Sequence, residues 1–227
     1  MFLCGGSGRR MFPITEDKFL LDFLGKSLLE HQIEIARGAG LTDFVIIGNP
    51  GNMARIEQIT QMLPGARFDL VFQREPLGIA DALKSARSSL SGPLLIVNPN
   101  DVFSGSAYTK IIDEAGRGRA ASCMLGYRVD TYFPGGYLEV NSENDLIHIV
   151  EKPPPGSEPG DLVNILVHCH SDPEMLLRHI ETVHTTTRDD VYECALDSML
   201  KAGHRIRVLP YDDFWAPIKY PWHIFRV

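Results

Sequence analysis

The chain has 227 residues, a formal net charge of −7, 44% hydrophobic residues and 22% charged residues. These values are typical of a soluble globular protein and exclude a disordered or fibrous chain, while the acidic balance and the lack of long basic runs argue against a nucleic-acid partner. No apolar run reaches the roughly 20 residues needed to cross a bilayer and no leader-like N-terminus is present, so we expect no membrane partner and a cytoplasmic location.

Short apolar runs alternate with helix-period patterns through the first part of the chain, which is typical of an α/β fold. The predicted strands of this part lie at 2–4, 44–47, 68–72 and 94–97. The predicted helices between them lie at 27–39, 52–62 and 79–88. Because three strand–helix units in succession are joined by right-handed crossovers, we expect the strands to form a parallel sheet.

The pattern changes after Asp101, where fewer helices separate the strands and the sheet is expected to become mixed. The predicted strands are 120–129, 136–140, 146–150, 162–168 and 206–209. The predicted helices are 107–115, one that opens with the capping residues 171–174, and 188–202. The Pro- and Gly-rich stretch 151–160 is interpreted as a loop and not a linker, since the next strand resumes the core at once. We therefore predict one domain over 1–227.

Three glycines, Gly5, Gly6 and Gly8, follow the first predicted strand, with Arg9 and Arg10 behind them. Glycines let a backbone approach an anion closely, and their N–H groups together with two guanidinium groups can surround a phosphate. Two well-known phosphate loops are excluded. The residue after Arg10 is a methionine where a dinucleotide-binding fingerprint needs its third glycine, and no Gly-Lys-Ser/Thr follows. By itself the segment is equally compatible with a plain tight turn.

The segment from Leu3 to Thr15, followed by Lys18 and by Gly25-Lys26-Ser27-Leu28, resembles the glycine-rich signature of the sugar-1-phosphate nucleotidylyltransferases. Further segments match that family in the same order. They are Gln73-Arg74-Glu75-Pro76-Leu77-Gly78, Asn100-Asp101, Gly136, Glu151-Lys152-Pro153 and Asn164. The resemblance extends over nearly the whole chain, and an ordered series of motifs is far more specific than a glycine loop alone.

The resemblance implies a Rossmann-like three-layer α/β/α sandwich with a mixed, mainly parallel sheet. It also implies a nucleotidyltransferase that condenses a nucleoside triphosphate, with UTP or dTTP favoured, with a sugar-1-phosphate to give a nucleotide sugar and pyrophosphate. The alternative is a catalytically weak homologue that binds nucleotide sugars as a regulator. The two substrates are the expected partners. Homo-oligomerisation, and continuation into a longer bifunctional protein of which this domain is the N-terminal part, stay open.

The resemblance assigns catalysis to Arg10, Lys18 and Asp101. Several phosphate groups meet in the reaction, so Arg10, Lys18 and Mg²⁺ are implied as the charges that neutralise the α-phosphate and the leaving pyrophosphate. Asp101 is the metal candidate because it follows the apolar run 94–97 and would lie at the carboxyl edge of the sheet. Mg²⁺ favours one or two carboxylates plus phosphate oxygens. Without the other motifs, helix capping would be the simpler explanation for this Asp.

The nucleotide contacts are assigned by the same resemblance. Gly5, Gly6 and Gly8 match the loop that wraps the triphosphate. Gln73 matches the residue that reads the base, because an amide can both donate to and accept from a pyrimidine edge. Gly78 would let the backbone approach the base or the ribose. Taken singly, Gln73 is equally well explained as a solvated loop residue and Gly78 as a turn glycine.

The sugar contacts lie in the second half of the chain. Gly136, Glu151 and Asn164 match positions that contact sugar hydroxyl groups, for which carboxylate and amide groups are suited. Lys152 could meet the phosphate of the sugar. Each of these residues, taken alone, is as well explained as an ordinary loop residue, so the assignment depends on the order of the motifs.

The chain also departs from the family pattern, at three places in a tolerable way: Arg9 for Thr, Asp17 for Pro and Asn100 for Gly. A more serious departure is Pro217, which stands in the segment 214–222 where the second metal carboxylate of the family is expected. Either Asp101 and the phosphates hold the metal alone, or Asp212 or Asp213 substitutes from a shifted register. This departure is what favours the regulatory alternative.

Other constellations are declined as functional sites. His168-Cys169-His170 lies in a predicted strand, where the histidines share one face and the cysteine points away, so a closed zinc site is not indicated. The glycine loop lacks the nucleophile elbow of serine hydrolases. Trp215 and Trp222 are interpreted as packing residues.

Overall fold

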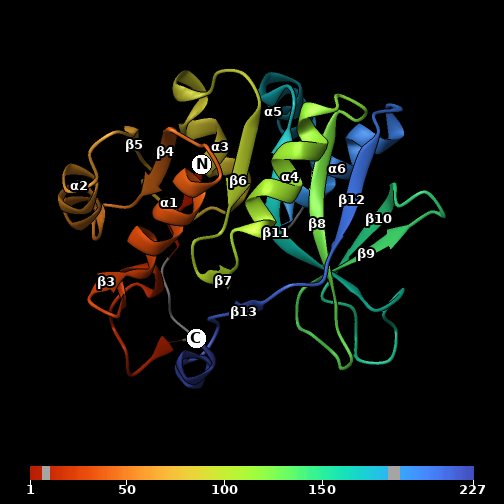
Figure 1. Ribbon diagram of the computed structural model, residues 1–227. Helices are drawn as coiled ribbons and strands as arrows, with labels where there is room; N and C mark the ends of the chain where they lie inside the picture. Colours follow the sequence, from red (N-terminus) through yellow and green to blue (C-terminus); the bar gives the residue numbers. More distant parts are fainter. Residues whose placement is uncertain (7–10, 184–189) are drawn as a thin grey trace.

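The computed structural model describes residues 1–6, 11–183 and 190–227, and its centre is one nine-stranded sheet (Figure 1). The strand order is β10-β9-β11-β6-β1-β4-β5, with β8 paired to β11 and β12 paired to β8. The strands are β1 (Phe2–Leu3), β4 (Asp43–Gly48), β5 (Arg67–Phe72), β6 (Leu94–Val97), β8 (Ser122–Arg128), β9 (Gly136–Val140), β10 (Leu146–Glu151), β11 (Leu162–His170) and β12 (Ile206–Tyr211).

The two halves of the sheet differ in how their strands pair. β1 lies parallel to β4 and β6, and β4 lies parallel to β5, as the successive strand–helix units predict. β11 runs antiparallel to β6, β8 and β9, β10 runs antiparallel to β9, and β12 lies parallel to β8. All strands of this sheet except β10 and β11 therefore point in one direction. The predicted mixed, mainly parallel sheet is confirmed.

The α-helices of the described residues cover both faces of the sheet (Figure 1). They are α1 (Leu28–Gly38), α2 (Met53–Gln61), α3 (Ile79–Ser85), α4 (Ser106–Gly116), α5 (Pro173–Thr182) and α6 (Val191–Lys201). One core cluster joins α1, α2 and α4 to one face of the sheet, and a second joins α3, α5 and α6 to the other. This is the predicted three-layer α/β/α sandwich. Within the described ranges, no helix combines the length and apolar character that a membrane crossing requires.

Neighbouring strand residues divide between the two core clusters because successive side chains of a strand point to opposite faces. Ile46 packs with α1 and Ile47 packs with α3. Val97 and Ile96 divide in the same way on β6. A strand buried on both faces needs apolar residues at every position, which is why these strands appear as continuous apolar runs in the sequence.

Capping side chains set where the helices begin. Ser27 Oγ accepts from the N–H of Glu30 at 3.2 Å, and Glu30 Oε2 accepts from the N–H of Ser27 at 2.7 Å, so a capping box starts α1. Asp172 Oδ1 accepts from two N–H groups of the first turn of α5, as its capping sequence predicts. α6 begins at Val191, and the beginning predicted at Arg188 lies outside the described residues.

Several short elements are not predicted by the sequence. β2 (Asp22–Phe23) pairs with β3 (Lys26–Ser27), and β7 (Asp101–Phe103) pairs with β13 (Trp215–Pro217). Figure 1 shows β3, β7 and β13 at the same end of the molecule, the lower end in that view. Asp101 follows β6 of the main sheet, as expected, and is itself the first residue of β7. The described residues also include the 3-10 turns η2 (Lys18–Leu20), η3 (Arg87–Ser89) and η4 (Pro221–Arg226).

A buried polar cluster joins α6 to the sheet within the second core. The Tyr192 hydroxyl lies 2.7 Å from Nδ1 of His168 and 2.9 Å from Nε2 of His170, and all three side chains are buried. The two histidines share one face of β11 while Cys169 packs in the opposite core, as the strand alternation predicts. Burial lowers the pKa of both histidines, that of His170 to about 4.

Acid should therefore destabilise the fold. An unfolded histidine titrates near pH 6.5, so between that value and the folded pKa the unfolded chain binds protons that the native chain does not. Stability should fall as the pH drops through this range, by about 2 kcal/mol at pH 5 for His170 alone. Urea unfolding at neutral and acid pH measures the loss. A His170→Gln variant, whose side chain does not titrate, should show a shallower pH dependence, and equal slopes in the two proteins would contradict the assignment.

Candidate active site

A cavity of about 390 Å³ lies at the edge of the sheet where β1, β5 and β6 end. It is lined, among other residues, by Gly5, Gly6, Gln73, Gly78, Asn98 and Asn100. Four of the residues predicted to contact the nucleotide therefore surround one space. Open α/β sheets bind ligands outside the carboxyl ends of their strands, so the cavity lies where a nucleotide is expected.

The glycine at position 5 is required by close contact with Gln73. A Cβ atom added at Gly5 would lie 2.1 Å from Gln73 Oε1 and 3.1 Å from Gln73 Cδ. Any larger residue at position 5 would displace the Gln73 side chain, which is 4% exposed. The first glycine of the loop thus makes room for the amide that faces the cavity.

The orientation of the Gln73 amide is set by two acceptors. Nε2 donates to the carbonyl of Gly78 at 3.1 Å and to Asp81 Oδ2 at 2.9 Å. Both amide hydrogens are used in this way, which leaves Oε1 as the atom that can contact a ligand. In this arrangement the amide presents an acceptor, Oε1, whereas the sequence predicted a group that both donates and accepts.

Gly78 precedes the first turn of α3 and has a φ of 87°. Only glycine adopts this left-handed conformation without strain. Because the Gly78 carbonyl also accepts from Gln73, the backbone at position 78 helps to fix the amide of Gln73. Gly78 therefore belongs to the cavity wall both by its position and by its hydrogen bond.

Asp101 is held by donors from distant parts of the chain. Its Oδ2 accepts from Trp215 Nε1 at 3.2 Å, its Oδ1 accepts from Asn98 Nδ2 at 3.4 Å, and its carbonyl accepts from Gln32 Nε2 at 2.7 Å. Burial raises the pKa of Asp101 to about 6, although the hydrogen bond from Trp215 acts in the opposite direction. The structure thus places an incompletely compensated carboxylate at the carboxyl edge of the sheet.

Two lysines contribute positive charge at this position. Burial raises the pKa of Asp101, and the positive charges of Lys219 and Lys18 act in the opposite direction and lower this pKa. Lys18 opens η2, and Lys219 Nζ donates to the Pro134 carbonyl at 3.0 Å while lying 3.7 Å from the centre of the Phe133 ring. The sequence predicted Lys18 for this site but did not single out Lys219.

The register of β7 and β13 sets Pro217 directly opposite Asp101. The position at which the resemblance places a second carboxylate therefore lies beside Asp101, and in this chain it carries a proline. Asp213 is engaged elsewhere, since it accepts from Ser104 Oγ at 2.5 Å and Ser106 Oγ at 2.7 Å. In the described part of the chain, no three or more His, Cys, Asp and Glu side chains gather as a metal-binding group.

The residues predicted to bind the sugar-1-phosphate lie together on β9, β10 and β11 and, for Lys152, directly after β10. A Cβ atom added at Gly136 would lie 3.0 Å from Glu151 Oε2 and 3.7 Å from Asn164 Cβ. Glu151 Oε1 forms an ion pair with Lys152 Nζ at 2.7 Å. Lys152 has a φ of 47°, a conformation that is uncommon for residues other than glycine. Four predicted residues thus form one cluster.

Two predicted site residues, Gly8 and Arg10, lie outside the described residues. Conversely, the structure brings Asp81 and Trp215 into the site, although the sequence did not single out the first and suggested only packing for the second. Trp215 packs against Tyr127 and Phe133, as the sequence suggested, and its indole N–H also donates to Asp101. The signal for Trp215 was available, since its segment matches a metal-binding segment of the family.

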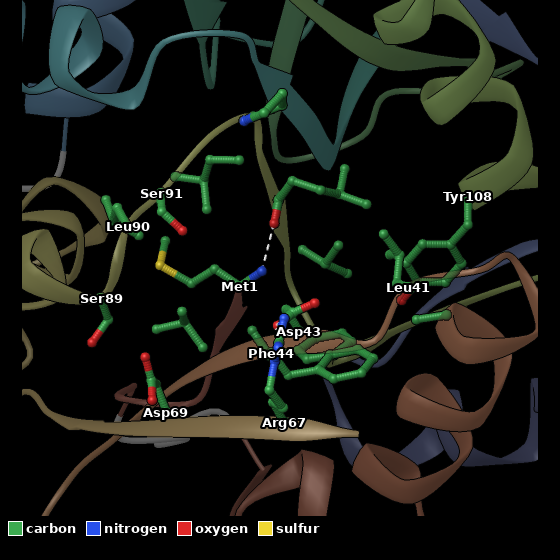
Figure 2. A pocket seen from close by; sticks show the side chains of 17 residues that line it. Met1, Leu41, Asp43, Phe44, Arg67, Asp69, Ser89, Leu90, Ser91 and Tyr108 are labelled. Atoms are coloured by element: carbon green, nitrogen blue, oxygen red, sulfur yellow. Dashed lines mark hydrogen bonds and ion pairs between the residues drawn. The ribbon is translucent and has the colours of Figure 1, made fainter. Parts of the chain in front are cut away.

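A separate hollow of about 260 Å³ lies at the opposite, amino ends of β1, β4, β5 and β6. Figure 2 shows it from close by, with the Met1 amino group donating to the Leu95 carbonyl at 2.6 Å. Asp43 and Arg67, which form an ion pair, are among its lining residues. None of the predicted site residues in the described ranges lines this hollow, so the candidate site lies at the carboxyl edge.

Known proteins match this chain over most of its length. The nucleotidyl transferase family model matches residues 1–215. A bifunctional sugar-1-phosphate nucleotidylyltransferase/acetyltransferase of Sulfurisphaera tokodaii is 26% identical over 234 residues, which cover 99% of this chain and 53% of the relative. A glucose-1-phosphate thymidylyltransferase of Xanthomonas campestris is 28% identical over 158 residues, covering 67% and 54%. The chain spans about half the length of the curated relatives it matches.

Solved structures share the fold. A UTP-bound UGPase from Acinetobacter baumannii has a TM-score of 0.82 at 17% identity, covering 99% of this chain and 90% of that chain. A UDP-glucose pyrophosphorylase complexed with UDP-glucose has a TM-score of 0.83 at 17% identity, covering 99% and 94%. Since the family model extends over nearly the whole sequence, the chain belongs to the nucleotidyl transferase family.

Proposed function

We propose that this chain transfers the nucleotidyl group of a nucleoside triphosphate to a sugar-1-phosphate and so produces a nucleotide sugar and pyrophosphate. The proposal is supported by where two groups of residues lie. Gly5, Gln73 and Gly78 line one cavity at the carboxyl edge, and the residues matched to the sugar phosphate gather on three neighbouring strands. The names of the Sulfurisphaera and Xanthomonas relatives support the same reaction. We further propose that 1–227 acts as a single catalytic domain.

UTP or dTTP is the favoured triphosphate because of the Gln73 amide. With Nε2 committed to Gly78 and Asp81, the amide offers the base an acceptor, Oε1. Uracil and thymine carry an N3–H donor on the edge that pairs with other bases, whereas adenine carries an acceptor, N1, at the corresponding place. If Gln73 Oε1 faced N1 of adenine, two acceptors would meet with no hydrogen between them, which is unfavourable in a cavity.

In the proposed reaction, a phosphate oxygen of the sugar-1-phosphate attacks the α-phosphorus. The bond from that phosphorus to the bridging oxygen breaks, and pyrophosphate leaves with the electron pair. Negative charge grows on the leaving group, and fixed positive charges favour the transition state where such charge develops. We assign this task to Lys18 and Arg10. Lys152 is assigned to the phosphate of the sugar, next to Glu151.

The resemblance also implies Mg²⁺, and the donor atoms near Asp101 fit such an ion. Asn100 Oδ1 is buried without a hydrogen-bond partner among the described residues, while its Nδ2 donates to Asn98 Oδ1 at 2.9 Å. A partly buried carboxylate and an unpaired amide oxygen in adjacent residues are oxygen donors of the kind that Mg²⁺ prefers. We propose that Asp101 and Asn100 hold the ion, which when bound would neutralise phosphate charge.

A pyrophosphate-release assay tests the proposed function directly. With a panel of sugar-1-phosphates and UTP, dTTP or ATP, we expect turnover with at least one sugar phosphate and a preference for the pyrimidine triphosphates. Nucleotide-sugar binding by calorimetry without turnover in any combination would overturn the catalytic proposal and favour the regulatory alternative.

The contact between Gly5 and Gln73 predicts a coupled pair of variants. Gly5→Ala should displace the Gln73 amide and reduce the preference for UTP over ATP, as Gln73→Ala should do directly. If Gly5→Ala acts through Gln73, its effect on this preference should be largely absent in the Gln73→Ala background. Additive effects of the two substitutions on the ratio of kcat/KM values would contradict the proposed role of the amide.

The metal assignment predicts different outcomes for two aspartates. Asp101→Asn should raise the Mg²⁺ concentration for half-maximal rate at least ~10-fold, because changes even beyond the direct ligands lower metal affinity by that order. Asn100→Gly should raise it as well, since it removes the unpaired oxygen. Asp213→Asn is the control and should leave the metal requirement unchanged. A shift in Asp213→Asn as large as that in Asp101→Asn would show that the C-terminal segment supplies a ligand.

A further inference from the structure

A chain of hydrogen bonds leads from the interior of the molecule to Asn164 of the sugar cluster. Its centre is the pair of histidines bridged by the Tyr192 hydroxyl. At one end, Ser122 Oγ lies 2.7 Å from Nδ1 of His170, and at the other, Nε2 of His168 lies 2.7 Å from Oδ1 of Asn164. Four hydrogen bonds thus connect Ser122, inside the second core, with a residue that the proposed function assigns to the substrate.

An irregularity in β11 makes the last contact possible. Two residues four positions apart in a regular strand lie roughly 13 Å apart, too far for this hydrogen bond. In β11, however, Ile165 pairs with Leu125 while His168 pairs with Met124, so the strand gains residues relative to β8 between these pairs. This bulge shortens the path from His168 to Asn164. Bulges of this kind are frequent next to active sites, where they redirect a side chain.

The protonation states of these side chains fix which atom donates and which atom accepts in each of the four hydrogen bonds. Burial lowers the pKa of both histidines and raises that of Tyr192, so all three groups are neutral near pH 7. Asn164 Oδ1 can only accept, so Nε2 of His168 carries its proton and Nδ1 accepts from Tyr192. The Tyr192 oxygen then accepts from Nε2 of His170, whose Nδ1 accepts from Ser122.

Donation in the opposite direction, from Asn164 towards Ser122, is disfavoured at Ser122. It would require the Ser122 hydroxyl to accept from His170 and to give its own proton to another group. The described residues offer Ser122 Oγ no hydrogen-bond partner other than His170. A buried hydroxyl proton without an acceptor is unfavourable. The direction from Ser122 to Asn164 leaves every proton of the chain in a hydrogen bond.

We propose that Ser122, His170, Tyr192 and His168 are positioning residues that hold the Asn164 amide with its Nδ2 group directed to the sugar, so that Asn164 donates to a sugar hydroxyl. This inference rests on the proposed function and adds to it the hydrogen-bonding role of one contact. Because Oδ1 is bound to His168, the two N–H groups of Asn164 are the part of the amide that can serve a substrate.

A fixed donor complements the other polar groups of the cluster. Glu151 is a carboxylate and can only accept from a sugar hydroxyl. A sugar hydroxyl has both a proton and lone pairs, so an acceptor and a donor placed side by side can satisfy neighbouring hydroxyls of one ring. If the amide of Asn164 were reversed, two acceptors would face the same part of the sugar and one would stay unpaired. The series of hydrogen bonds from Ser122 to Asn164 excludes this reversed orientation of the amide.

Nuclear magnetic resonance on the full chain tests the direction of hydrogen-bond donation without any substrate. With ¹⁵N-labelled histidine, both His168 and His170 should be neutral near pH 7, with the proton on Nε2 and an unprotonated Nδ1. The Tyr192→Phe and His170→Gln variants assign the signals. A proton on Nδ1 of His168 would overturn the proposal. This measurement is independent of activity, so it holds even if the proposed function fails.

Kinetics test the effect on the substrate. Tyr192→Phe removes the hydroxyl that joins the histidines and should raise the KM for the sugar-1-phosphate about 10-fold, with the KM for the triphosphate unchanged. A panel of monodeoxy sugar-1-phosphates sharpens the test. The wild type should use the analogue that lacks the hydroxyl contacted by Asn164 less well than the complete sugar-1-phosphate. This difference should be smaller in Tyr192→Phe.

Ser198→Ala is the matched control, because it removes a hydrogen bond between α6 and another histidine, His179, outside this chain of hydrogen bonds. It should leave the KM for the sugar-1-phosphate unchanged. An equal rise of both KM values in Tyr192→Phe would indicate a merely structural role and would overturn the proposal, as would an unchanged KM for the sugar-1-phosphate. Absence of turnover in the wild type with every substrate pair would instead reject the proposed function.

Discussion

The partial burial of one negative charge beyond the end of β6 organises the carboxyl edge of the sheet. A carboxylate removed from water is strongly unfavourable unless donors or cations surround it. The Asp101 carboxylate obtains donors from the loop after β6 through Asn98 and from β13 through Trp215, which lies 114 residues further along the chain, while Gln32 of α1 donates to the backbone carbonyl of Asp101. The C-terminal segment thus returns to the edge at which the sheet carries its polar groups, and it closes the site from that side.

Each helix layer supports a different part of the proposed site. On one face, the buried Tyr108 hydroxyl of α4 donates to Gln32 at 3.0 Å, and Gln32 in turn holds the backbone of Asp101. On the other face, Tyr192 of α6 connects through His168 to Asn164. In both cases a tyrosine in the core fixes a polar group at the edge through one intermediate side chain. Two residues of the proposed site, Asp101 and Asn164, are therefore held by hydrogen bonds that begin in the hydrophobic cores.

The long elements could be predicted from the sequence because their patterns are local. The strand at 44–47 is a continuous apolar run, and the helix at 27–39 has both a capping box and a regular apolar spacing. The site was less predictable. Its residues came from resemblance to a family, and their hydrogen-bond partners depend on contacts that no local pattern encodes. β7 and β13 have three residues each and form only by pairing across the chain, and the amide of Gln73 is oriented by Asp81, eight positions later.

The backbone of Lys152, in the sugar cluster, has an unfavourable conformation. A left-handed conformation is unfavourable by roughly 1–2 kcal/mol for a residue with a Cβ atom, and a glycine at this position would avoid that strain. Folding alone would therefore tolerate or prefer glycine at the end of β10. The lysine instead supplies an ammonium group that pairs with Glu151, so replacement by glycine would leave a well-folded protein that has lost a charge next to Glu151. Sequence change at this loop would then affect chemistry before it affects the fold.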